Sequence, residues 1–132
     1  MLNTQRVLFD TTVLIDLLTR RPKAIARLRA LAEQGAKMAV SIVSVAEIYG
    51  GLVPGEEERT ARLLELFDVI PLSEDLARRS GELVAARRRV GRSYTIDDMM
   101  IAATAVEFSY LLYTTNKKDF EVPRLTFYAP ER

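Results

Sequence analysis

Hydrophobic and polar positions along the chain follow two periods, one typical of buried strands and the other typical of helices. Short apolar runs predict strands over Arg6–Asp10, Met38–Val43, Asp68–Leu72, Tyr110–Thr114 and Leu125–Tyr128. Apolar residues spaced three or four positions apart predict helices over Thr12–Thr19, from Pro22 to Gly35, from Ser44 to Gly51, and over Glu56–Phe67, Ser73–Val90 and Ile96–Val106. The last helix is apolar almost all round, which predicts a buried central element.

Strands that alternate with helices indicate parallel crossovers and a sheet that is covered on both faces. No repeat, low-complexity tract or linker divides the sequence. We therefore predict one α/β domain over residues 1–132, with three α/β/α layers and a mostly parallel central sheet. In such sheets, binding sites form beyond the carboxyl ends of the strands.

The composition restricts the chemistry that this domain can perform. The 132 residues include no histidine and no cysteine. A Ser-His-Asp triad, a cysteine nucleophile and a Cys/His zinc site are therefore excluded. The net charge of +1 argues against binding nucleic acid through global charge alone. Uncharged runs of at most nine residues are too short to cross a bilayer, and Met1–Arg6 lacks a signal-peptide pattern, so we expect a cytoplasmic protein without membrane contact.

Acidic side chains occur where the predicted strands end. Asp10 closes the first strand, Glu47 lies in the helix after the second, and Asp98 opens the apolar helix. Asn116 and Asp119 follow the strand that ends at Thr114. Because parallel strands end at one edge of a sheet, these side chains are expected to converge there.

Two of these acids also have a purely structural interpretation. Ser44-x-x-Glu47 and Thr95-x-x-Asp98 each fit a capping box at a helix start. Capping does not explain the acids after the first and fourth strands. Converging carboxylates repel one another and require a cation, and oxygen-only ligands suit Mg²⁺ or Mn²⁺. Such ions activate water for the hydrolysis of phosphodiesters.

Four segments resemble, in order and spacing, the motifs of PIN-domain ribonucleases, and above all of the VapC-type toxins of bacterial toxin–antitoxin pairs. They are Phe9–Asp16, Ser44–Glu47, Asp98–Ala105 and Thr114–Phe120, and the resemblance covers essentially the whole chain. It implies a Mg²⁺- or Mn²⁺-dependent endoribonuclease with a small α/β/α sandwich. Such proteins are usually dimeric, and a cognate antitoxin that reaches into the acidic site inhibits them.

The resemblance also implies residue roles. Asp10 and Asp98 would be the principal metal ligands, and Glu47 would be a third acid that acts directly or through water. The fourth catalytic acid would be Asp119, while Asn116, at a position that often holds Asp in the family, would be a positioning amide.

Three further polar residues near these motifs are open to interpretation. Thr12, where the family often has Asn or Ser, keeps a hydroxyl that could orient Asp10. Neighbouring helix positions point about 100° apart, so Asp97 is expected to be solvated or a partner of the helix dipole rather than a second ligand beside Asp98. Asp16 lies among apolar neighbours, and either a salt bridge or a role in the site would explain it.

Residues 78–92 contain six arginines and the single acid Glu82. This segment is either a solvated helix face or a surface that balances the acidic site and binds the RNA backbone. The candidate backbone contacts are Arg87, Arg88, Arg89 and Arg92. Apolar residues such as Leu17, Leu28 and Leu31 are expected in the core, and the resemblance implies an antitoxin or second-subunit surface around the early helices and Tyr49–Val53.

Three alternatives use the same first strand differently. A phosphohydrolase of the haloacid dehalogenase kind would use Asp10 as a nucleophile, but it needs an Asp where Thr12 stands. A receiver domain needs an acidic pair and a later Lys that are missing from the matching places. A non-catalytic PIN-like binding module usually loses the acids that are present here.

Overall fold

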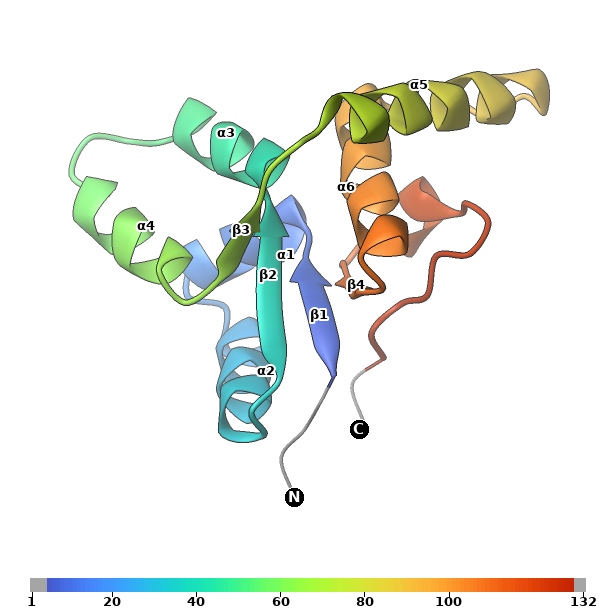
Figure 1. Ribbon diagram of the computed structural model, residues 1–132. Helices are drawn as coiled ribbons and strands as arrows, with labels where there is room; N and C mark the ends of the chain where they lie inside the picture. Colours follow the sequence, from blue (N-terminus) through green and yellow to red (C-terminus); the bar gives the residue numbers. More distant parts are fainter. Residues whose placement is uncertain (1–4, 130–132) are drawn as a thin grey trace.

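Four parallel strands form the central sheet of the computed structural model, which describes residues 5–129 (Figure 1). The strands are β1 (Arg6–Phe9), β2 (Lys37–Ser41), β3 (Asp68–Ile70) and β4 (Leu111–Tyr113), in the order β3-β2-β1-β4. The sheet confirms the predicted α/β class. The ends of the predicted domain, residues 1–4 and 130–132, lie outside the described part of the chain.

Helices cover both faces of this sheet, as expected for an α/β/α sandwich (Figure 1). They are α1 (Thr11–Leu18), α2 (Pro22–Glu33), α3 (Ile42–Gly50), α4 (Glu57–Leu64), α5 (Glu74–Arg89) and α6 (Ile96–Glu107), followed by the 3₁₀ helix η1 (Lys117–Phe120).

Successive strand residues point to opposite faces, and each face therefore has its own core. Val7 and Phe9 of β1 pack with the buried side of α1 and α2, including Leu17 and Leu31. Leu8, between Val7 and Phe9, packs instead with α6. The predicted core positions in the early helices are confirmed, with Leu28 partly buried at its margin.

The boundary between β2 and α3 differs from the prediction. The strand ends at Ser41, and α3 begins at Ile42 rather than at Ser44. Ser41 has extended backbone angles, and its side chain accepts a hydrogen bond of 3.1 Å from the N–H of Val43. The expected Ser44-x-x-Glu47 capping box is therefore wrong. The second expected cap is confirmed, because Thr95 accepts from the N–H of Asp98.

The predicted strand Leu125–Tyr128 forms only a single bridge, in which Phe127 pairs with Leu112 of β4. Leu112 donates its N–H to Thr126 at 2.9 Å, and Tyr128 donates to Leu112 at 2.9 Å. The preceding Arg124 has a left-handed φ of 70°, which turns the chain just before a longer strand would begin.

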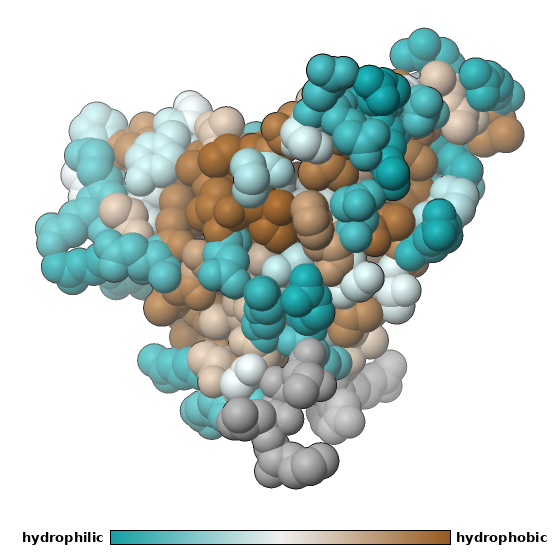
Figure 2. Space-filling model, in the orientation of Figure 1, coloured by the Kyte–Doolittle hydropathy of each residue, from teal (hydrophilic) through white to brown (hydrophobic). Residues whose placement is uncertain are grey.

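The surface separates into polar and apolar regions. Apolar side chains gather at the centre of the face in Figure 2, over the upper parts of β2 and β3, whereas α4 and α5 are mostly polar. Within residues 5–129, no helix combines the length and apolar character needed to span a membrane.

Candidate acidic site at the carboxyl edge of the sheet

Asp10 lies at the centre of the candidate site, directly after β1 and before α1. Its backbone N–H donates to the carbonyl of Tyr113 at 2.9 Å, which fixes it beside the end of β4. The side chain is only 2% exposed. Oδ2 accepts hydrogen bonds of 2.7 Å from the hydroxyls of Thr12 and Thr114. This supports the predicted contact between Thr12 and Asp10, and it adds a second hydroxyl from the neighbouring strand.

Glu47 projects from α3 toward the same edge. The hydroxyl of Thr11 lies 2.7 Å from Oε1 of Glu47 and 2.8 Å from the hydroxyl oxygen of Ser44. Because a hydroxyl has one proton, Thr11 donates to the carboxylate and accepts from Ser44. Much of the Glu47 side chain is exposed, but its carboxyl group is partly withdrawn from water. This desolvation, followed by a hydrogen bond with Asp97, raises the pKa of Glu47 to about 7.

Asp98 lies in the first turn of α6 and faces the other acids. Burial is the largest cause that raises the pKa of Asp98 to about 6, although a hydrogen bond with Thr95 acts in the opposite direction. The negative charges of Asp97, Asp10 and Asp119 raise this pKa further. Asp98 is therefore close enough to Asp10 and Asp119 for their charges to act on it.

The segment after β4 supplies the fourth acid. The side-chain amide of Asn116 donates a hydrogen bond to Oδ2 of Asp119. Its own backbone N–H donates to the Thr114 hydroxyl at 3.0 Å, so Thr114 is hydrogen-bonded to both Asp10 and the Asn116 backbone. The Asn116 amide therefore contacts the fourth acid directly, a contact that the sequence did not predict, while its expected role in positioning substrate stays a prediction.

The expected convergence of acids at the carboxyl edge is therefore present, but the acids are not arranged as a closed cage. Among the residues from 5 to 129, no three acidic side chains are placed as ligands of one metal ion. Mg²⁺ is usually held by one or two carboxylates and keeps several waters. The oxygen-only donors and the mutual repulsion at Asp98 thus fit a hydrated divalent cation.

Two acids outside the predicted ligand set are also placed. Asp97 lies in the first turn of α6, as expected, and its hydrogen bond with Glu47 lowers its pKa, a contact that the sequence did not predict. Asp16 forms an ion pair of 3.5 Å with Arg21, which agrees with the structural interpretation of that acid.

The four arginines proposed as RNA contacts divide into two pairs. Arg87 donates to the carbonyl of Glu121 at 3.2 Å, and Arg92 forms an ion pair of 3.4 Å with the Glu121 carboxylate. Arg88 and Arg89, in the last turn of α5, are exposed. Neither Arg88 nor Arg89 forms an ion pair with a residue between positions 5 and 129.

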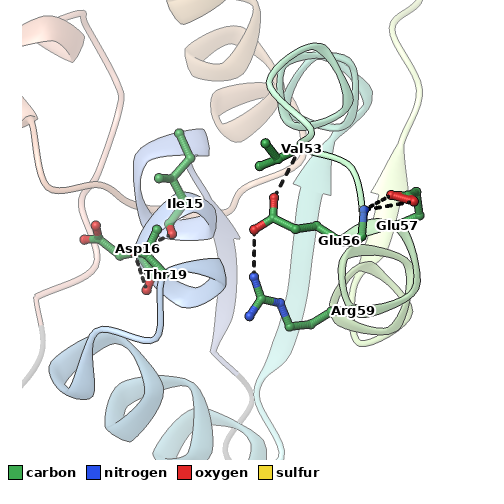
Figure 3. A network of polar contacts seen from close by, with 8 residues as sticks. Ile15, Asp16, Thr19, Val53, Glu56, Glu57 and Arg59 are labelled. Atoms are coloured by element: carbon green, nitrogen blue, oxygen red, sulfur yellow. Dashed lines mark hydrogen bonds and ion pairs between the residues drawn. The ribbon is translucent and has the colours of Figure 1, made fainter.

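An apolar groove of about 270 Å³ lies beside the acids, between α1, α3 and the segment that leads into α4. Glu47 lines it, so the groove opens onto the acidic site. Figure 3 shows Ile15 of α1 on one side and Val53 and Glu56 on the other. Glu56 accepts from the Val53 N–H at 3.4 Å and from Arg59 at 3.0 Å, which fixes this wall.

The hydroxyl groups around the acids were largely missed by the sequence analysis. Thr114 stands at the end of a strand, so the rule that selected Asp10 also applies to it. Thr11 and Ser44 offered no such signal, because their contact joins α1 to α3 and depends on how the two helices pack.

A parallel α/β/α sandwich with acids gathered at its carboxyl edge defines a class of domain whose ligand site lies at that edge. The chain belongs to the PIN domain family, which its sequence matches over residues 7–124. It is 38% identical over 85 residues to ribonuclease VapC10 of Mycobacterium tuberculosis, a match that covers 64% of each protein and hence less than two thirds of that relative. It is 30% identical over 117 residues to ribonuclease VapC1 of Methanocaldococcus jannaschii, covering 88% of this chain and 79% of that protein.

Solved structures show the same fold. A toxin–antitoxin complex from Klebsiella pneumoniae contains a chain with 33% identity and a TM-score of 0.73, covering 91% of this chain and 95% of that one. VapBC2 from Rickettsia felis, bound to a DNA fragment from its promoter, superposes with a TM-score of 0.79 at 24% identity, covering 94% and 98%. The second likeness concerns the fold alone.

The raised pKa of Asp98 predicts that this acid destabilises the fold as the pH rises. Between its ordinary value of 3.8 and about 6, the folded state binds more protons than the unfolded state, so the free energy of unfolding falls across this range. Without divalent ions, Asp98→Asn should therefore become more stable than the wild type above pH 6. We expect a gain of roughly 1 kcal/mol, reduced by the solvent that reaches this half-buried group.

Urea unfolding of both proteins across this pH range measures the difference. If the free energies of unfolding of the two proteins differ by the same amount at every pH, the pKa of Asp98 is not raised in the folded state. The pKa of Glu47 is shifted in the same direction, so Glu47→Gln should change the curve in the same sense.

Proposed function

We propose that this chain is a metal-dependent endoribonuclease and the toxin component of a toxin–antitoxin pair. The observation that carries the proposal is the buried Asp10 carboxylate, which two hydroxyls hold and whose negative charge acts on Asp98 of α6. Relatives that are named ribonucleases support the assignment. The family membership and the retained acids together favour hydrolysis over simple binding.

We infer that the cofactor is Mg²⁺ or Mn²⁺, because the donors are carboxylate and hydroxyl oxygens. Asp10 and Asp98 would hold the ion, with Glu47 as a third acid directly or through water. A divalent cation bound here supplies charge neutralisation at the scissile phosphate and an activated water.

The surrounding side chains set the orientation of these acids. Thr12 and Thr114 fix one oxygen of Asp10, which leaves Oδ1 free of those two bonds. Thr11 orients Glu47, and Asn116 orients Asp119. Asp119 would then act as the fourth catalytic acid, and Asn116 and Thr12 as positioning residues for the bound RNA and its cleavage.

The RNA backbone needs cations near this acidic edge. In our proposal, Arg88 and Arg89 provide them, because they are exposed at the end of α5. Arg87 and Arg92 are both bonded to Glu121, which makes them less available to the RNA backbone.

The apolar groove beside Glu47 is the proposed antitoxin site. Ile15 and Val53 on its walls are 48% and 54% exposed. Thr60 also lines the groove, and its hydroxyl is buried without a hydrogen-bond partner within residues 5–129. An extended peptide with an apolar side chain would fit the exposed apolar walls of this groove. The toxin–antitoxin complex of Klebsiella pneumoniae supports a partner of this kind.

Two further expectations accompany this function. We propose a homodimer, supported by the exposed apolar area that Figure 2 shows over the upper parts of β2 and β3. The cytoplasmic location stays a prediction of the sequence. The alternative of an Asp10 nucleophile is less well supported, because Thr12 provides a hydroxyl where that chemistry needs a second acid.

We expect Asp10→Asn and Asp98→Asn each to reduce RNA cleavage on the order of 100-fold or more. Mutating a residue that contacts a metal only through another ligand already lowers metal affinity or activity about 10–100-fold, and a direct ligand should matter more. Asp16→Asn is the matched control, since its carboxylate pairs with Arg21 outside the site. Cleavage is measured by sequencing the 5′ ends of RNA fragments after induced expression. Products with 5′-phosphate and 3′-hydroxyl ends are expected, and EDTA should abolish the cleavage of RNA by the purified protein.

Activity that survives EDTA, or fragments that end in a 2′,3′-cyclic phosphate, would exclude this chemistry. If purified wild-type protein binds RNA without cleaving it, the non-catalytic binding module becomes the better interpretation. A phosphorylated Asp10 in the mass spectrum would instead favour the nucleophile mechanism.

The exposed arginine pair predicts salt-sensitive RNA binding. In an Asp98→Asn background, which prevents cleavage, Arg88→Gln/Arg89→Gln should lower the slope of log affinity against log salt by about 1 to 2. Binding of a labelled single-stranded RNA at several salt concentrations measures this slope. Arg62→Gln is the control, because Arg62 pairs with Glu58 on α4. An unchanged slope would show that the RNA backbone does not contact Arg88 and Arg89.

Because the groove lies beside the acids, a substitution in it should prevent antitoxin binding without preventing RNA cleavage. Val53→Asp should prevent co-purification with the product of a short gene adjacent to this one, because a charge in the groove costs desolvation. Leu66→Asp is a matched control, since Leu66 is also 54% exposed but lies outside the groove. RNA cleavage should persist in both variants. A complex that still forms with Val53→Asp would reject the groove as the antitoxin site.

A further inference from the structure

The segment that carries Asp119 has little regular structure of its own. η1 is a four-residue 3₁₀ helix in which the N–H of Asp119 donates to the carbonyl of Asn116 at 3.1 Å. Short 3₁₀ helices have poor hydrogen-bond geometry and are weakly stable by themselves. The position of Asp119 relative to the other acids must therefore be fixed by contacts with other parts of the fold.

The hydroxyl of Tyr94, in the loop between α5 and α6, supplies such contacts. It donates a hydrogen bond of 3.1 Å to the carbonyl of Lys118 and accepts one of 3.2 Å from the N–H of Glu121. These two residues flank Asp119 on either side. A third hydrogen bond of 3.3 Å comes from Arg92. The hydroxyl thus uses its one proton and both lone pairs, which is its full capacity.

Neighbouring groups hold this junction in place. Arg92 also pairs with the Glu121 carboxylate at 3.4 Å, and Arg87 of α5 donates to the Glu121 carbonyl at 3.2 Å. The Tyr94 ring packs against the core cluster on the α6 side of the sheet. The next residue, Thr95, caps α6 at the N–H of Asp98. One short loop therefore contacts the segments that carry two of the acids, Asp98 and Asp119.

We propose that Tyr94 is a positioning residue that sets the placement of Asp119 relative to Asp98, and that Arg87 and Arg92 support it by holding Glu121. Tyr94 acts through the backbone on both sides of Asp119 and does not touch the reacting atoms. Its importance for a bound cation rests on the proposed function. Its control of η1 does not, because that follows from the hydrogen bonds alone.

The test compares Tyr94→Phe, which keeps the packed ring and removes only the hydroxyl, with the wild type. Mn²⁺ affinity is measured from the electron paramagnetic resonance signal of the free ion. We expect affinity about 10-fold weaker in Tyr94→Phe, the size typical of an indirect metal partner. Tyr110→Phe is the matched control, because Tyr110 precedes β4 at the opposite edge of the sheet, where Arg6 covers its ring.

A double-variant cycle identifies the route of the effect. In an Asp119→Asn background, Tyr94→Phe should cause no further loss of Mn²⁺ affinity, because the acid that it positions is no longer charged. An equal 10-fold loss in that background would overturn the proposal, as would an affinity within twofold of the wild type for Tyr94→Phe alone. Arg92→Gln provides a second variant with the Tyr94 hydroxyl intact, and a smaller loss in the same direction is expected.

Amide hydrogen exchange separates this proposal from the proposed function. The N–H groups of residues 119–122 should exchange faster in Tyr94→Phe than in the wild type, while those of β1 should not change. If wild-type protein binds no Mn²⁺, the proposed function fails, and faster exchange in this segment would still support the positioning role. Unchanged exchange in the segment would reject that role, whatever the protein does to RNA.

Discussion

The burial of the Asp10 carboxylate is the constraint around which the site is organised. A charged group removed from water is costly unless hydrogen bonds compensate it. Here the compensation comes from two hydroxyls, one in α1 and one after β4, that meet at a single oxygen. The Asp10 backbone joins the same elements, since its N–H bonds to β4 and its carbonyl accepts from α1. Satisfying one carboxylate therefore fixes β1, β4 and α1 at one point.

The other acids add repulsion that the rest of the fold has to offset. Glu47 and Asp98 both have raised pKa values, which shows that the folded chain destabilises their charged forms. Repulsion between buried like charges is typical of functional sites. It lowers the stability of the fold, but it keeps the charged groups in the arrangement that the site needs. The two apolar cores, one on each face of the sheet, provide the compensating stabilisation.

Local patterns were sufficient for the order of strands and helices and for the residues at the strand ends. The sheet, its parallel sense and the convergence of Asp10, Asp98 and Asp119 follow from those patterns. The start of α3 did not, because Ser41 and Ser44 are equally good caps in sequence and tertiary contacts decide between them. The roles of Arg87, Arg92 and Tyr94 depend on Glu121, which is distant in sequence and can only be recognised in the folded chain.

The pairing of β1 with β4 also determines when during synthesis the site is completed. Val7 pairs with Leu111, and the Thr114 hydroxyl reaches back 104 positions to Asp10. A growing chain that has passed α5 therefore contains Asp10 and Glu47 but lacks the central strand's second neighbour and the η1 acid. Contacts of such long range form late and slowly. In a chain whose synthesis stops before β4 and η1, the proposed cleavage site would therefore stay incomplete.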